Sequence, residues 1–523
     1  MNWLDYVIIV VYSIGLLGLG FLFKEQKDKQ DFFLGGRSFG WFSMGMSTMA
    51  SQLSAISFIS AAAFVGMKQG GGMQWLTFEF AVPLAMIFLI VVLIPPLYKA
   101  GVVSIYAFLE ERFGPSTRML ISAVFQFSRA FATGIMIYTV AIVLSAVMGI
   151  PNWQTILLAG IITIIYSIQG GMKAVIWGDV IQMMILLLGI ILCIGFGLHH
   201  LGGWDQFLAM ADHSRWDAID YNWGFSEGEE FGVWPMIIGG FFLYTSYYGC
   251  DQSQAQRSLS GKSLKEVQRA LLFNGLFRFP VTLSYCFMGL IIGTFAFATP
   301  EFMGQIPSDS PDQMVPLFII NYMPNGIVGL LLVAILAAAM SSLSSAINSL
   351  SAATLEDLVI RNRSTPMDDA QTLRYSKGLT LAWGLVCILL AFTAGEIAPT
   401  VIEAINKVGS AFYGPIVATF ILAILSKKTT TLGINIGLLV GVSVNLFIWQ
   451  SGQPIFWIWW NFIGAAITLS LGYFLSLLLP KPAEKKVLLE APNLQFFRTE
   501  NYLLVGYFLF MIWFSSSLLG WFT

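Results

Sequence analysis

Two stretches of the sequence are rich in hydroxyl groups although their surroundings are apolar. Residues 40–66 read GWFSMGMSTMASQLSAISFISAAAFVG, with serines every three or four positions, so a helix there would carry one column of hydroxyls. Residues 325–355 contain MSSLSSAINSLS, where serines and one asparagine crowd two turns. Close helix packing explains either stretch alone. The two together also match a hard cation such as sodium, which needs several oxygens but no full negative charge.

Charged residues inside apolar stretches are the second set of chemically informative positions. A charge at that depth is unfavourable by at least about 2.5 kcal/mol, so each one needs a partner or a function. Arg129 lies near the middle of its stretch and requires an anion: Glu79, Glu403 or a carboxylate on a bound solute. A structural Arg–Glu pair is an equally good explanation. Asp179 is either functional or a partner of Lys173.

The overall composition requires a membrane as solvent. Of the 523 residues, 57% are apolar and 11% are charged, whereas soluble domains are about 25% charged. This excludes a soluble enzyme, and we find no catalytic pair such as Asp-Asp or His-Glu within the apolar stretches. No basic stripe for nucleic acid is present, and the four cysteines lack the spacing of a disulfide framework or a zinc site.

We expect an all-α polytopic membrane protein with about fourteen transmembrane helices. Each apolar run is long enough to cross a hydrocarbon layer of about 30 Å as a helix. The predicted spans are residues 3–23, 40–66, 74–98, 119–148, 154–172, 175–201, 232–250, 269–298, 325–355, 374–395, 399–425, 431–450, 455–479 and 501–522.

The loop charges predict the orientation of these spans. Most of the 27 Lys and Arg residues lie in loops on one side, which the positive-inside rule assigns to the cytoplasm. Both termini and the acidic segment 205–230 are then external. The sequon Asn362-Arg363-Ser364 falls on the cytoplasmic side, which favours a multi-pass protein of a bacterial inner membrane. The oligomeric state cannot be derived from the sequence.

An external N-terminus makes spans 2–6 and spans 7–11 run in opposite directions. This topology predicts a five-plus-five inverted repeat, the arrangement of many secondary transporters. The predicted parts are an extra N-terminal span and cytoplasmic loop, a first repeat, an external acidic loop, a second repeat and three C-terminal spans: 1–39, 40–201, 202–231, 232–425 and 426–523.

Five motifs, spread over almost the whole chain, resemble those of the sodium/solute symporters. They are ASQLSAISF, YSIQGGMKAVIWGDVIQ, YYGCDQSQAQRSLS, MSSLSSAINS and GPIVATFILAILSKKTTTLG. This family includes sodium/glucose, iodide, vitamin and sialic acid carriers and has a LeuT-type fold. The resemblance implies sodium-coupled import of a small polar solute, with one or two sodium ions as the coupling ion.

The resemblance also implies which residues bind sodium. The principal site would use three carbonyls and two adjacent hydroxyls, those of Ala50, Leu53, Ala338, Ser341 and Ser342. Some family members have a second site, whose matching residues here are Asp179, Ser342, Ser344 and Ser345.

For the solute, the sialic acid branch of the family gives one interpretation. An arginine in this span faces the substrate carboxylate there, which corresponds to Arg129, and Ser54 and Ser57 match polar contacts. This resemblance favours an organic anion or a sugar acid such as sialic acid.

The sugar branch gives the other interpretation, a glucose, galactose or polyol carrier. Glu79 and Asn406 match residues that contact sugar hydroxyls, Arg278 stands where that branch has a lysine, and Tyr247 matches a gating aromatic. Tyr244 replaces an asparagine of that branch. A channel, which needs a continuous polar pore, and a membrane sensor, which needs a signalling domain, are alternatives of another class.

Overall fold

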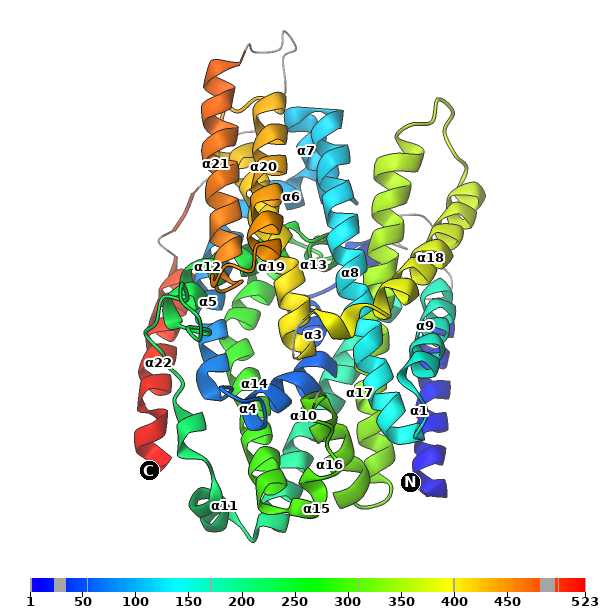
Figure 1. The fold of residues 1–523 in the computed structure, drawn as a ribbon. Helices are drawn as coiled ribbons and strands as arrows, with labels where there is room; N and C mark the ends of the chain where they lie inside the picture. The colour runs from blue at the N-terminus through cyan, green and yellow to red at the C-terminus, as the bar shows by residue number, and fades with distance from the viewer. Residues whose placement is uncertain are drawn as a thin grey trace.

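The computed structural model describes residues 2–22, 34–53, 55–169, 172–308, 310–397, 400–479, 494–496 and 498–522. Within these residues the protein is a bundle of helices (Figure 1), and its backbone pairing outside helices includes one isolated bridge between Phe39 and Gly261. The bundle is held together by helix packing rather than by a sheet.

The helices follow the predicted spans closely. The principal segments are α1 Trp3–Leu22, α3 Trp41–Gln52, η2 Ser57–Ala61, α4 Ala62–Gly66, η3 Met73–Glu79, α5 Ala81–Phe88, η4 Leu89–Leu93, α6 Ile94–Ala100, α7 Ile105–Phe113, α8 Pro115–Met148, α9 Asn152–Gln169, α10 Met172–Leu201, α12 Val233–Cys250, α13 Gln252–Leu259, α14 Leu264–Ala298, η6 Pro311–Gln313, α16 Met314–Tyr322, α17 Ile327–Ala353, η7 Thr354–Ile360, α18 Asp369–Ala391, α19 Val401–Leu425, α20 Thr431–Gln450, α21 Trp459–Leu478 and α22 Thr499–Phe522.

Helices occupy all fourteen intervals in which spans are predicted. By length and composition, nine helices of the described chain could cross a membrane, or ten if the bent second span is counted as one. The protein is therefore multi-pass. Both chain ends lie at one end of the bundle, which we call the terminal end, and α7 lies at the opposite end (Figure 1).

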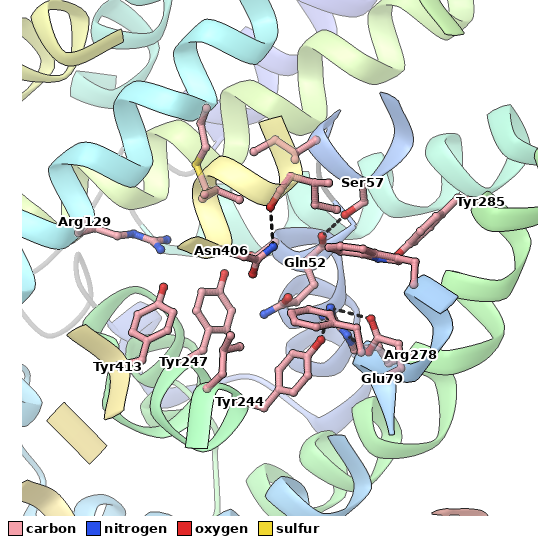
Figure 2. Close-up of a pocket in the computed structure, with 18 residues that line it drawn as sticks. Gln52, Ser57, Glu79, Arg129, Tyr244, Tyr247, Arg278, Tyr285, Asn406 and Tyr413 are labelled. Atoms are coloured by element: carbon pink, nitrogen blue, oxygen red, sulfur yellow. Dashed lines mark hydrogen bonds and ion pairs between the residues drawn. The ribbon is translucent and has the colours of Figure 1, made fainter. Parts of the chain in front are cut away.

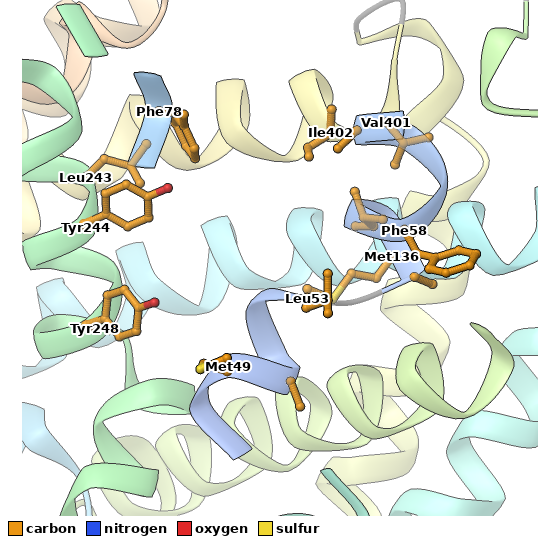
Figure 3. Close-up of a cluster of buried hydrophobic side chains, with 14 of the residues drawn as sticks. Met49, Leu53, Phe58, Phe78, Met136, Leu243, Tyr244, Tyr248, Val401 and Ile402 are labelled. Carbon is orange, nitrogen blue, oxygen red and sulfur yellow. The ribbon is translucent and has the colours of Figure 1, made fainter. Parts of the chain in front are cut away.

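The second predicted span is broken in the middle. Helix α3 ends at Gln52, and a π-helical turn that begins at Ser57 leads into α4, at an angle of 57° to α3. A helix that ends inside a bundle leaves the carbonyls of its last turn to find other partners. The carbonyl of Gln52 accepts the Ser57 hydroxyl at 2.8 Å. Apolar side chains surround the break, with Leu53 and Phe58 beside Met136 (Figure 3).

Glycines allow α4 and α14 to touch backbone to backbone. A Cβ added to Gly66 would lie 2.1 Å from the carbonyl oxygen of Gly289, and one added to Gly293 would lie 2.2 Å from that of Gly66. Gly289 and Gly293 are four positions apart on one helix face, the small-residue spacing that lets membrane helices approach closely. This contact fixes the second half of the broken span against α14.

Replacing Gly293 by valine is expected to destabilise the protein by about 2–3 kcal/mol or more, because the new side chain would collide with backbone that cannot retreat. Thermal unfolding of the detergent-purified protein measures the effect. Gly506→Val in α22 is the matched control, since nothing lies within 4 Å of a Cβ built there. Equal melting temperatures for the two variants would contradict the close contact.

Candidate functional site

A central pocket of about 680 Å³ lies beside the break in the second span. It is lined by residues of α3, η2, η3, α8, α12, α14 and α19, segments far apart in the sequence. The lining includes all the predicted solute-binding residues that the structure describes: Ser57, Glu79, Arg129, Tyr247, Arg278 and Asn406. The remaining one, Ser54, lies outside the described residues.

The polar groups of the pocket are arranged in two clusters (Figure 2). Arg129 lies on one side beside Tyr247 and Tyr413, and Glu79 and Arg278 lie together on the other side. Gln52 and Asn406 lie between them (Figure 2). A solute in this pocket would therefore contact two different polar surfaces at its two ends.

Glu79 and Arg278 form an ion pair whose charged groups are hydrogen-bonded to each other and to neighbouring side chains. The guanidinium donates to both carboxylate oxygens, with Nη2 3.1 Å from Oε1. Thr282 adds a hydrogen bond to Oε1 at 3.0 Å, while the hydroxyls of Tyr244 and Tyr248 accept from Arg278 at 3.3 and 3.2 Å. Because the two buried charges are paired and hydrogen-bonded to each other, this cluster forms a polar wall without net charge.

Arg129 pairs with Asp251, a residue that sequence reasoning missed. Its Nη1 lies 3.4 Å from Asp251 Oδ2, and both side chains are buried. The other oxygen of Asp251 caps helix α13, accepting from the backbone and hydroxyl of Ser253 at 2.9 and 2.6 Å. An aspartate directly after a predicted span, at the start of a polar helix, is the signal that could have identified it.

The expectation that Glu79 or Glu403 neutralises Arg129 is wrong. Glu79 is bound by Arg278, and Glu403 by Lys68, whose Nζ lies 2.7 Å from Oε1. Sequence position gave the depth of each charge but not its partner, because several helices reach that depth.

Three buried side-chain nitrogens among the described pocket residues have no hydrogen-bond partner: Gln52 Nε2, Trp75 Nε1 and Arg129 Nε. All three are donors. Burying a polar group without a partner destabilises a protein by about 1–3 kcal/mol, so a bound solute that accepted hydrogen bonds from these groups would stabilise the protein. The ligand that would satisfy these three carries acceptor atoms.

The predicted principal sodium residues lie on α3 and α17, which pack against each other. Ala50 and Leu53 are buried at the end of α3, and Ser342 is buried on α17. The side chains of Ala338 and Ser341 are outside what the structure describes, although their backbone belongs to α17. The end of α3 presents the partial negative charge of a helix C-terminus in the middle of the bundle.

Asp179, the predicted carboxylate of a second sodium site, lies on α10 in a fully buried cluster. Its Oδ2 accepts from the hydroxyl of Ser47 on α3 and lies 3.1 Å from Arg257 Nη2 on α13. Ser344 and Ser345 are buried on α17, which packs against α10. Arg257 is a second functional candidate that sequence reasoning left unassigned, although it stands in the YYGCDQSQAQRSLS motif.

The start of α19 is held by side chains from other segments. Asp312 in η6 accepts from the Val401 amide at 3.1 Å, and Ser60 in η2 accepts from the Ile402 amide at 2.9 Å. Lys68 reaches Glu403 in the first turn of the helix. Ile402 also lines the pocket, so these contacts fix one segment of the pocket wall.

The buried carboxyl group of Asp312 is expected to make the folding stability of the protein depend on pH. Burial, together with the nearby charge of Glu403, raises the pKa of Asp312 from 3.8 to about 6. The folded state therefore binds this proton more tightly than the unfolded chain. The resulting stability is present below about pH 4, is lost as the pH rises through about 6, and amounts to at most about 3 kcal/mol.

Asp312→Asn is expected to remove this component, so its melting temperature should change less than that of the wild type between pH 4 and pH 7. Thermal unfolding across this range, in one detergent and at one salt concentration, measures it. Superimposable pH profiles for the two proteins would show that Asp312 does not titrate there.

The comparison with known families decides the identity of the chain. The model of the sodium:solute symporter family matches residues 32–441. The chain belongs to this family. The symporter is therefore a sodium-coupled transporter and not an enzyme, and the matched range contains every predicted sodium and solute residue.

Characterised relatives of the symporter include transporters of several solutes. The sodium/iodide cotransporter of Homo sapiens is 30% identical over 85% of this chain and 68% of the relative. The sodium-coupled monocarboxylate transporter 2 of Mus musculus is 29% identical over 85% of this chain and 72% of the relative.

Among solved structures, a Na⁺-coupled sialic acid symporter in a substrate-bound outward-open state has a TM-score of 0.83. It is 24% identical, and the match covers 93% of this chain and 100% of that chain. The nucleobase-cation-symport-1 transporter Mhp1 has a TM-score of 0.53 at 13% identity, over 91% of this chain and 97% of its own. The fold of the symporter is thus the LeuT-like fold expected from its motifs.

Proposed function

We propose that this symporter imports a small organic anion, a class that includes sugar acids such as sialic acid, together with sodium. The observation that carries the proposal is a set of three buried donors without a partner among the pocket residues: Arg129 Nε, Gln52 Nε2 and Trp75 Nε1. A carboxylate offers two acceptor oxygens and is bound well by a guanidinium. Binding such a solute would satisfy groups that the protein alone leaves unsatisfied.

The solutes in the names of similar proteins support an anion. Iodide and monocarboxylates are the solutes named for the relatives, and sialic acid for the solved structure. The cluster around Arg129 would hold the charged end of the solute, and the Glu79–Arg278 wall would contact its neutral polar end. A solute that contacts both the Arg129 cluster and the Glu79–Arg278 wall must have a charged end and a neutral polar end. An organic anion has both, whereas a simple halide has only the charge.

For the ion, we propose a principal sodium site where α3 crosses α17. The ligands would be the carbonyls and hydroxyls expected from the family motifs: Ala50, Leu53, Ala338, Ser341 and Ser342. The break after Gln52 supports this placement, because carbonyls at a helix end within the bundle are available to a cation. A second sodium ion at Asp179, with Ser344 and Ser345, is the alternative stoichiometry.

We also propose the membrane arrangement that the loop charges predict. The terminal end would face outwards in a bacterial inner membrane, with fourteen spans and an inverted repeat formed by residues 40–201 and 232–425. Alternating access would then open the pocket first outwards and then inwards. Sodium entry down the membrane potential supplies about 2.3 kcal/mol per charge per 100 mV.

The second candidate function is sodium/sugar symport, favoured by the presence of Glu79 and Asn406 in the pocket lining. The ion pair weakens it, because the Glu79 oxygens that would accept sugar hydroxyls are already bound by Arg278 and Thr282. A membrane sensor or channel is the candidate of another class.

Two measurements test the proposal. A thermal-shift screen of carboxylates, sugars and polyols in sodium buffer identifies the ligand class, and we expect a carboxylate to stabilise the protein most. Uptake of that labelled ligand into proteoliposomes should then require an inward sodium gradient. Stabilisation by neutral sugars alone would favour the second candidate, and absence of sodium-driven uptake of any stabilising ligand would favour a sensor or channel.

A further inference from the structure

An arginine of the short helix α13 lies beside Asp179, where a second sodium ion is expected. Arg257 is 1% exposed and lies against Asp179, which is 2% exposed, and against Ser47, which is fully buried. The three residues come from α13, α10 and α3, so the cluster joins both halves of the proposed repeat. A carboxylate and a hydroxyl are also the oxygens that a sodium ion would use.

Arg257 is held by more than its ion pair. Its Nε donates to Ser47 Oγ at 3.0 Å, its Nη1 to the Ser253 carbonyl at 2.7 Å and its Nη2 to Asp179 at 3.1 Å. A sodium ion that displaced it from Asp179 would leave a buried guanidinium without a counter-charge, which is strongly unfavourable. A sodium ion that joined it would add a second positive charge beside one carboxylate, where repulsion is weakly screened.

We propose that Arg257 sets the sodium stoichiometry of this symporter: its guanidinium serves as a built-in cation on Asp179, so only the α3–α17 crossing binds sodium. This inference rests on the proposed sodium symport and selects one of its two stoichiometries. Arg257 is a specificity-determining residue in this sense, since the side chain at this position decides whether Asp179 needs an ion from solution.

The placement of α13 also links this cluster to the pocket. Asp251, which caps the start of α13, pairs with Arg129. Arg257, in the last turn of the same helix, pairs with Asp179. The two ion pairs therefore lie at the two ends of α13, Gln252–Leu259, which packs against α3 and α17. The guanidinium of Arg257, at the C-terminal end of α13, would hold the helix against Asp179 even when no sodium ion is bound there.

The test counts the sodium ions bound by detergent-purified full-length protein at saturating radioactive sodium, without any solute. We expect one bound ion for the wild type, two for Arg257→Gln and one for Asp179→Asn. The double variant Asp179→Asn with Arg257→Gln should return to one. Arg257→Lys keeps the charge and should also bind one.

Two ions in the wild type and one in Asp179→Asn would overturn the inference, as would a single ion in Arg257→Gln. If Arg257→Gln does not fold, the Asp179→Asn count decides: an unchanged count supports a built-in cation, and a lower count contradicts it. A wild type that binds no sodium would contradict the proposed sodium symport. A wild type that binds two ions would contradict only the role given to Arg257.

Discussion

Replacing Arg129 by glutamine is expected to raise the dissociation constant of a carboxylate solute about 100-fold. A hydrogen bond to a charged group contributes roughly 1.5–3 kcal/mol, and every 1.4 kcal/mol corresponds to a factor of about ten in affinity. Arg129 has a buried Nε without a partner and a long contact of 3.4 Å to Asp251, so it retains the capacity to bind an anion. Equilibrium titration of the best carboxylate ligand in sodium buffer measures the change.

The variant Asp251→Asn tests whether Arg129 binds the solute or only joins helices α8 and α13. The asparagine keeps an oxygen to cap α13 but removes the negative charge that competes for Arg129. The affinity for the carboxylate is therefore expected to rise in Asp251→Asn and to fall in Arg129→Gln. If both variants lose affinity to the same extent, the pair only joins α8 to α13 and the proposed carboxylate contact is wrong.

Ser342→Ala is expected to raise the sodium concentration for half-maximal uptake by about 10- to 100-fold. The hydroxyl would be one of the oxygens around the ion, and its loss corresponds to about 1.5–3 kcal/mol. Sodium titration of solute uptake in proteoliposomes measures the shift. Solute binding should weaken less at saturating sodium, because the pocket residues remain intact.

Ser349→Ala is the matched control on the same helix. Ser349 is fully buried, but its hydroxyl already donates to the Ala346 carbonyl at 2.8 Å within α17. Its removal should leave the sodium dependence unchanged. A normal sodium dependence in Ser342→Ala would contradict the placement of the ion at the crossing of α3 and α17.

Residue composition and spacing predict the membrane class, the position of the helices and most residues of the pocket lining. Apolar length is a property of each segment, so the predicted intervals coincide with helices. Buried charges are rare enough in spans to indicate function individually, which predicts a role for Arg129. The family resemblance adds Glu79 and Arg278, and all three residues line one pocket.

Which charges are partners depends on how the helices pack in three dimensions. Arg129 and Asp251 are 122 positions apart, and Asp179 and Arg257 are 78 apart. The choice among carboxylates at similar depth depends on which helices touch and how each is rotated. The break after Gln52 likewise became visible only in three dimensions, since the serine-rich stretch has the periodicity of a continuous helix.

This difference follows from the range of the interactions. Hydrophobic transfer and helix formation act along the chain and are encoded locally, so residue type and spacing predict them. An ion pair acts between side chains within a few ångströms of each other, and its energy in a bilayer depends on the surroundings that the whole bundle creates. The location of the functional charges could therefore be predicted, whereas their pairing could not.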